Sequence, residues 1–326
     1  MKRLVFLLVA CCLALPAAEP LLLVSQKAGS SVGFYTWEGK HLTSVPVGTH
    51  PHEMTLSADG RYAYTTDNGT MRIEQAGAGG NSMSVIDLRE HKRVAQISLG
   101  KYHRPHGIDV DPATGNVLIT SENPDQLLVV DPRAQTVLRT YGTGGSTPHI
   151  VTAGREGKWA YVSNARSGTV AAIELATGRT ITIPAGDRPE GSVLSKDGKT
   201  LYVANRVSNE VTIIDTVAKK RTGTIPVGGG PVRVGLSPDE RFVIYALIGD
   251  HKLGFADIAA RKQVAVVDLD GPPVSLHTSP DGKYAFAASQ EADTVYVVSI
   301  AEKKLVRKFK TTAGAGPDPV LQIPVL

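Results

Sequence analysis

Residues 188–228 read RPEGSVLSKDGKTLYVANRVSNEVTIIDTVAKKRTGTIPVG, and this stretch shows the unit from which most of the chain is built. It contains four short strand signals: one after Pro189, an apolar run at 201–205, an alternating run at 211–215 and a last run ending near Gly228. The Asp-Gly pair at 197–198 supplies the left-handed backbone of a tight hairpin. Prolines 41 to 54 residues apart begin six such units and a seventh partial one: Pro51, Pro105, Pro148, Pro189, Pro231, Pro273 and Pro319.

A period of about 40 to 50 residues with four strands per unit is typical of a β-propeller. The two ends of the chain complement each other. Residues 21–47 carry three strand signals but lack the first, whereas residues 319–324 carry only a first strand. Joined, they make one more blade and leave no open sheet edge at the seam. The sequence therefore predicts an all-β, seven-bladed β-propeller with four antiparallel strands per blade, occupying residues 19–326 as one domain.

Three recurring motifs accompany the prolines: a Ser-Pro-Asp turn at 237–239, Tyr-Val-Ala-Asn at 202–205 and Val-Ile-Asp at 85–87. In these motifs the chain resembles the YVTN-type seven-bladed β-propeller repeat family, which includes YncE-like and surface-layer proteins. The resemblance covers nearly all of the chain after its first residues and implies the propeller fold. It leaves function open, because propellers serve in binding, scaffolding and catalysis alike.

The first 18 residues have the pattern of a secretory signal peptide. Lys2 and Arg3 precede an apolar run at 4–15, and small residues follow at 16–18. We therefore expect a periplasmic or secreted protein whose mature chain has no cysteine and no transmembrane segment. Residues 8–11 also resemble a lipobox, which would make Cys11 a lipidated N-terminus, but the apolar residues after it argue against this alternative.

Charge argues against nucleic acid as a partner. The formal net charge is +4, of which Lys2 and Arg3 contribute two units, and no concentrated basic stripe is present. The glycine-rich run at 77–80 has no strand–turn–helix context, so no nucleotide cofactor is expected. The expected partners are a small molecule, a metal ion or an envelope protein, and the chain is expected to be a monomer.

The residue after each anchoring proline is the most informative position for function. Inner strands surround the axis of a propeller, so side chains at equal phase meet at the mouth of the central channel. Three imidazoles and a carboxylate in neighbouring blades suit Zn, Fe, Mn or Cu. In chain order the position holds His52, His106, His149, Glu190, Val232, Val274 and Val320, of which the first four are the predicted metal ligands. A metal-free polar ligand site and a purely structural cluster remain open as alternatives.

Further residues near this mouth are candidates for ligand contact or catalysis. Arginines beside the proline turns are able to pair with an anion or with a neighbouring blade, and asparagines in the loops are either ligand contacts or turn residues. The ligand-contact candidates are His50, Arg104, Arg188, Arg233, Asn164, Asn205 and His277, and the candidate catalytic bases are Glu122 and His103. An insertion at 68–81 accounts for the widest repeat spacing and is expected beside His52, as a mobile lid or as a tolerated surface loop.

These observations support three functions. The first is a propeller that binds a metal ion, a small ligand or both at the channel mouth. The second is an enzyme, namely a metal-dependent hydrolase, lactonase or lyase, for which propeller enzymes offer an analogy of fold only. The third is a cell-surface scaffold for protein interaction. The sequence alone does not decide whether the protein is an enzyme.

Overall fold

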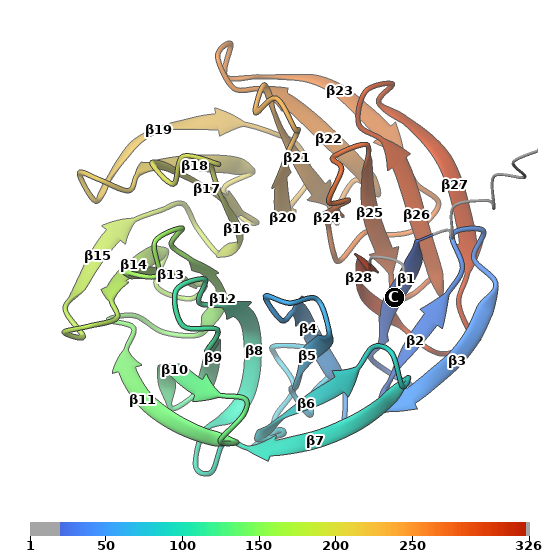
Figure 1. Ribbon diagram of the computed structural model, residues 1–326. Coiled ribbons are helices and arrows are strands. Elements are labelled where there is room, and N and C mark those ends of the chain that lie inside the picture. Colours follow the sequence, from blue (N-terminus) through green and yellow to red (C-terminus); the bar gives the residue numbers. More distant parts are fainter. Residues whose placement is uncertain (1–19, 324–326) are drawn as a thin grey trace, which may run out of the picture.

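The computed structural model describes residues 20–323 and arranges 28 strands there as seven four-stranded antiparallel sheets around one axis (Figure 1). The predicted all-β, seven-bladed propeller is confirmed. The predicted signal peptide and its two cysteines lie outside the described residues, as do residues 324–326. Across residues 20–323, no helix has the length and apolar character needed to span a membrane.

The seven sheets are called blades 1 to 7, and the strands of each are given from the axis outward. Blade 1 contains β28 (Pro317–Ile323), β1 (Leu21–Gln26), β2 (Ser31–Tyr35) and β3 (His41–Pro46). Blade 2 contains β4 (Pro51–Leu56), β5 (Tyr62–Asp67), β6 (Ser82–Asp87) and β7 (Lys92–Ser98). Blade 3 contains β8 (His103–Val110), β9 (Val117–Asn123), β10 (Asp125–Asp131) and β11 (Thr136–Gly142). Blade 4 contains β12 (Pro148–Ala153), β13 (Trp159–Asn164), β14 (Thr169–Glu174) and β15 (Thr180–Pro184).

The remaining blades repeat the same order. Blade 5 contains β16 (Pro189–Leu194), β17 (Thr200–Asn205), β18 (Glu210–Asp215) and β19 (Lys220–Pro226). Blade 6 contains β20 (Pro231–Leu236), β21 (Phe242–Leu247), β22 (Lys252–Asp257) and β23 (Lys262–Asp268). Blade 7 contains β24 (His277–Thr278), β25 (Tyr284–Ser289), β26 (Thr294–Ser299) and β27 (Lys304–Lys310).

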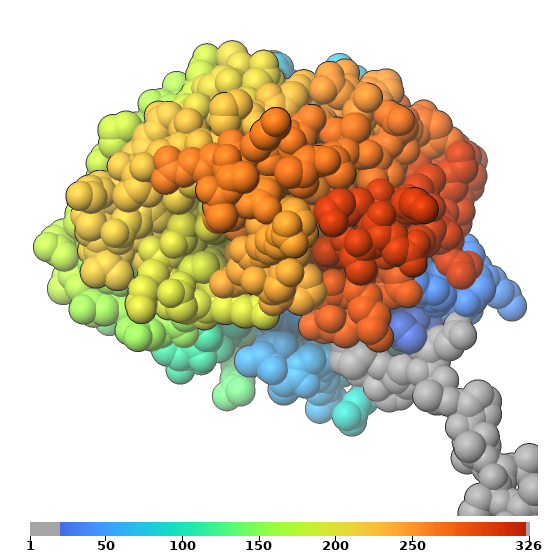
Figure 2. All heavy atoms as spheres, turned by 90° about the horizontal axis from the view of Figure 1, so that it is seen from above, coloured from blue at the N-terminus to red at the C-terminus, as the bar shows by residue number. Residues whose placement is uncertain are grey.

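Blade 1 closes the ring as the sequence predicts. Strand β28 pairs antiparallel with β1, so the last described strand lies beside the first. The side chain of Val320 is fully buried, in a cluster with Leu22 and Val24 of its own blade and with Val295 and Val297 of blade 7. The hydrophobic core thus lies between adjacent blades. Seen from the rim, blades 5 to 7 form one continuous surface (Figure 2).

Six of the seven inner strands begin with the same backbone conformation. In six blades the residue before the first proline has a left-handed φ, between 47° and 72°; these residues are His50, Arg104, Thr147, Arg188, Gly230 and Gly316. In the same six blades the pairing register shifts just after that proline, which is a β-bulge. A bulge places two residues against one on the partner strand and redirects their side chains.

The left-handed residue and the bulge show that the seventh anchoring proline was misassigned. In blade 1 the left-handed residue is Gly316, and Pro317 pairs with Gln26 just as Pro51 pairs with Asp67 in blade 2. The seventh anchor is therefore Pro317 and not Pro319. Consequently Asp318, not Val320, occupies the position equivalent to His52. The expectation was wrong because the segment Pro-Asp-Pro offers two prolines two residues apart, and only the pairing register distinguishes them.

Replacing Val320 by Ala should lower the free energy of unfolding by about 2 kcal/mol, because the change leaves a cavity where β28 closes the ring. The matched control is Val306→Ala in the outer strand β27, where the side chain is 46% exposed; there the change should be within about 0.5 kcal/mol. Urea denaturation of the three proteins gives both values. Equal stabilities for the two variants would contradict the closing role of β28.

Candidate functional site

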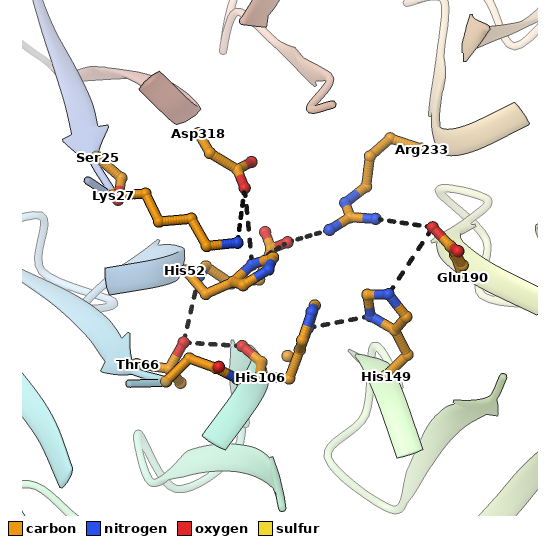
Figure 3. A network of polar contacts seen from close by, with 12 residues as sticks. Ser25, Lys27, His52, Thr66, His106, His149, Glu190, Arg233 and Asp318 are labelled. Carbon is orange, nitrogen blue, oxygen red and sulfur yellow. Dashed lines mark hydrogen bonds and ion pairs between the residues drawn. The ribbon is translucent and has the colours of Figure 1, made fainter. Parts of the chain in front are cut away.

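The mouth of the central channel has a polar side and an apolar side. At the position after the anchoring proline, blades 1 to 5 carry acidic or imidazole side chains, and blades 6 and 7 carry valine. In blade order the residues are Asp318, His52, His106, His149, Glu190, Val232 and Val274. The five polar side chains converge at the mouth, joined by Lys27 and Arg233 (Figure 3).

Glu53 joins this group although it directly follows His52. In a regular strand, consecutive side chains point to opposite faces. The bulge between Pro51 and Met54 removes this alternation. As a result, one nitrogen of His52, one oxygen of Glu53 and one nitrogen of His106 all lie within 4.8 Å of one another.

The three imidazoles form a compact row. The ring centroids of His52 and His106 are 3.8 Å apart, and those of His106 and His149 are 3.7 Å apart. The Nδ1 atoms of His106 and His149 are 3.0 Å apart, so one donates a hydrogen bond to the other and the two rings take opposite tautomers. This hydrogen bond requires that at least one of the two rings is neutral.

Burial keeps all three imidazoles neutral. Desolvation lowers the pKa of His52 well below its usual value, and the positive charges of Lys27 and Arg233 lower it further. The pKa of His106 is lowered by burial and by the neighbouring imidazoles, and that of His149 by burial and Arg233. Neutral imidazoles present the lone pairs that metal ions require.

Threonines of the second strands hold the backbone of this row in place. The Thr66 hydroxyl donates to the carbonyl oxygen of His106 at 2.8 Å and accepts from the backbone N–H of Glu53. Thr120 does the same one blade further on, donating to the carbonyl oxygen of His149 at 2.7 Å and accepting from the N–H of Gly107. Each threonine thereby ties its own inner strand to the next one and keeps the imidazoles in register.

Two buried ion pairs balance charge around the imidazoles. The Nη2 atom of Arg233 bonds Oε1 of Glu53. Burial alone would raise the pKa of Glu53, but the Arg233 guanidinium holds it well below its usual range, so the carboxylate is ionised. On the other side, Nζ of Lys27 lies 3.8 Å from Oδ2 of Asp318. Burial raises the pKa of Asp318 and lowers that of Lys27, and each charge opposes the shift of the other.

Glu190 belongs mainly to a cluster of arginines. Its carboxylate lies 3.0 Å from Nε of Arg188, 3.5 Å from Nη1 of Arg206 and 4.0 Å from Nη1 of Arg233. The nearest nitrogen of His149 is 3.8 Å away. The structure therefore brings all four predicted metal ligands to the mouth, but it is Glu53, not Glu190, that lies beside His52 and His106.

A cavity of about 870 Å³ opens above this cluster. His52, His106, His149 and Glu190 line it on one side, together with Arg188, Arg206 and Arg233. Val232, Val274 and Ile248 line the side formed by blades 6 and 7. The cavity is in the size range of small-molecule sites, which combine apolar walls with a few convergent polar groups.

Glu122 occupies a second, much smaller cavity. This cavity measures about 10 Å³, close to the room that one water needs, and its lining includes His52, His106, Arg104 and Glu122. Nε of Arg104 donates to Oε2 of Glu122 at 2.8 Å, whereas Oε1 is buried without a hydrogen bond among the described residues. Burial raises the pKa of Glu122 to about 7 against the opposing charge of Arg104.

The other sequence candidates lie outside both cavities. His50 and His103 are half-buried near the starts of their inner strands, and His277 lies deeper, on β24. Asn164 and Asn205 are fully buried and serve their own blades: Asn164 donates to the Thr143 carbonyl oxygen, and Asn205 accepts from the Gly186 N–H. Both are the last residues of strands, β13 and β17, and neither has a left-handed φ, so they are neither ligand contacts nor turn residues.

Sequence reasoning missed three charged residues of the site. Asp318 was missed through the choice of anchor, although Pro317 preserves the repeat. Glu53 was missed because strand alternation points it away from His52. Lys27 follows β1 with no motif around it, and nothing in the sequence distinguishes it from a surface lysine.

The comparisons with known proteins show the fold and leave the family undetermined. No protein-family model matches the chain, and no curated protein does. Among solved structures, Kuenenia stuttgartiensis hydrazine synthase is 21% identical with a TM-score of 0.75, over 86% of this chain and 92% of that chain. The Pseudomonas aeruginosa periplasmic gluconolactonase PpgL is 17% identical with a TM-score of 0.76, over 95% and 100%. Dihydro-heme d1 dehydrogenase NirN, in complex with DHE, is 16% identical with a TM-score of 0.65, over 90% of this chain but only 64% of that chain. The TM-scores show a shared propeller architecture, and identities this low show nothing beyond it.

The neutral state of His149 predicts a pH dependence of stability. The unfolded chain takes up a proton at this residue as pH falls through about 6.5, and the folded chain does not until much lower pH. Stability is therefore lost as pH falls. His149→Gln removes this loss, so its free energy of unfolding should rise relative to the wild-type protein by about 1.4 kcal/mol per pH unit between about pH 6 and 5.

Urea denaturation in the presence of a chelator measures this difference without interference from metal binding. Comparing variant with wild type cancels the contributions of titrating groups that do not contact His149, which leaves those of His149 and its neighbour His106. Parallel curves of stability against pH for the two proteins would show that His149 is not buried in its neutral form.

Proposed function

We propose that this protein binds a divalent transition metal ion through His52, His106 and Glu53 and holds a small ligand in the cavity above it. The observation that carries the proposal is the convergence of three ligand atoms, two from imidazoles and one from a carboxylate, within 4.8 Å of one another. Imidazole and carboxylate together are ligands that Zn, Fe, Mn and Cu accept.

Two features of the residues present fit a metal ion. The Nδ1 atom of His52 is buried and has no hydrogen bond among residues 20–323, and a metal ion would satisfy such an atom. Glu53 is ionised and bonds Arg233, and His106 is hydrogen-bonded to His149. Such outer contacts orient the ligands of a metal ion. Positive charge on Arg233 and Lys27 weakens cation binding, and Glu53, Asp318 and Glu190 offset it.

His52 and His106 also line the large cavity, and three protein ligands would not fill the coordination sphere of a metal ion. Structural zinc sites are closed by four protein ligands, whereas three-ligand sites leave room for water or a substrate. The site is therefore suited to holding a ligand. A periplasmic or secreted location, expected from the first 18 residues, is part of the proposal.

Elemental analysis of protein purified without a metal-affinity column tests the proposal. We expect about one metal ion per chain and, for His106→Ala, at least tenfold weaker binding, because a direct ligand is lost. The matched control is His251→Asn at the rim of the same cavity, where asparagine tolerates the left-handed backbone. His106→Ala that is folded by circular dichroism and still holds stoichiometric metal would refute the assignment.

A metal-dependent hydrolase acting on lactones or esters is the second candidate. A metal ion with only three protein ligands would have room for a substrate. This chain also shares its fold with a periplasmic gluconolactonase over the whole length of that protein. Glu122 is suited to general acid–base work, because a pKa of about 7 allows it to accept and return a proton near neutral pH. A water in its small cavity would lie between Glu122 and the imidazoles of His52 and His106.

Turnover of a panel of lactones and esters, with and without chelator, tests this second candidate. We expect turnover that requires metal and a loss of about 100-fold or more in kcat for Glu122→Gln, with KM little changed. Glu291→Gln removes a carboxylate from the rim of the large cavity and is the control. No turnover with any of the four metals would exclude the hydrolase and leave the binding proposal intact.

A further inference from the structure

The insertion at residues 68–81 lies across the mouth of the channel. Met71, Arg72, Ile73 and Glu74 of this segment line the large cavity. Arg104 clamps its backbone by donating to the carbonyl oxygens of Ile73 and Gln75 at 2.8 Å each and to that of Arg72 at 3.4 Å. The segment is therefore part of the cavity wall and more than a tolerated surface loop, and its expected mobility stays a prediction.

Glu74 of this segment places a carboxylate on an arginine three blades away. Its Oε1 accepts a hydrogen bond from Nη2 of Arg188 at 2.8 Å, although the two residues are 114 positions apart. The hydrogen bond from Arg188 lowers the pKa of Glu74, so the carboxylate is charged. Glu74 is 62% exposed and Arg188 27% exposed, and ion pairs this accessible are weak and exchange readily with other anions.

Arg188 and Arg206 retain donors for a further anion. A guanidinium carries five N–H donors. Buried Glu190 takes Nε of Arg188, and Arg206 makes a single 3.5 Å side-chain contact to the same carboxylate within the described part of the chain. Both arginines line the large cavity, as do Val232 and Val274 at the starts of the next two blades.

We infer that Arg188 and Arg206 form a subsite for the carboxylate of a small organic acid, and that Glu74 occupies this subsite in the absence of ligand. The ligand carboxylate displaces Glu74 and bonds the two guanidiniums, and its apolar part faces Val232, Val274 and Ile248. The insertion is thus an internal competitor that the ligand releases. This inference rests on the proposed function only in using the same cavity, and it does not require the metal ion.

Hexanoate and its uncharged analogue hexanamide are suitable probes, with inorganic phosphate as a third. Binding to chelator-treated full-length protein is measured by calorimetry or by NMR titration. Glu74→Gln should lower the Kd for hexanoate about twofold to fivefold, which is what an exposed ion pair is worth. Arg206→Met should raise it about tenfold, through loss of a charge-assisted hydrogen bond. Hexanamide should respond to neither change.

Glu291→Gln is the matched control, because it removes one negative charge from the rim of the same cavity without touching Arg188. A gain in affinity equal to that of Glu74→Gln would reduce the effect to net charge and overturn the inference. Absence of hexanoate binding to Glu74→Gln would also overturn it. So would a result in which the two substitutions change the Kd for phosphate but not the Kd for hexanoate. Metal binding by His106→Ala is measured separately, so the metal site and the carboxylate subsite are tested independently.

Discussion

The bulged start of the inner strands is the constraint on which the site depends. A left-handed residue and a proline bring the chain to the axis in six of the seven blades, and the bulge that follows redirects the next two side chains. Because the device recurs at equal phase, side chains from separate repeats meet at one place. His52 and Glu53 come to lie together for this reason, and His106 reaches them from the next blade. The site is therefore a consequence of the repeat itself, varied only in the side chains that each copy carries.

Electrostatics then determines what this convergence is able to bind. Burying carboxylates and cations together is stable only when they are paired, and here Glu53 pairs with Arg233, Asp318 with Lys27 and Glu190 with its arginines. Nitrogens of His52 and His149 lie 3.5 to 3.8 Å from these same carboxylates, but burial keeps the imidazoles neutral. A row of neutral imidazoles beside an ionised carboxylate is suited to a cation, whereas the arginine side of the same cavity is suited to an anion. The two sides offer complementary places for a metal ion and an acidic ligand.

Much of this was predictable from residues alone, for a definite reason. The proline period and the Asp-Gly turns determine the blades, because each unit buries its faces only against its neighbours. The convergence of the three imidazoles was predictable because they occupy the same position in successive repeats. Asp318 and Glu53 did not, because both depend on the register of a bulge, which period and alternation do not describe. The contact between Glu74 and Arg188 was beyond prediction as well, since the insertion that carries Glu74 has no counterpart in the other repeats.

The most direct test of the central claim is a crystal structure of protein purified with its native metal, with anomalous diffraction recorded at the absorption edge of that metal. The account predicts one anomalous peak at the channel mouth, about 2.0 to 2.2 Å from a nitrogen of His52, a nitrogen of His106 and an oxygen of Glu53. A mouth without a peak in metal-loaded crystals, or a peak held only by residues at the rim of the cavity, would contradict it.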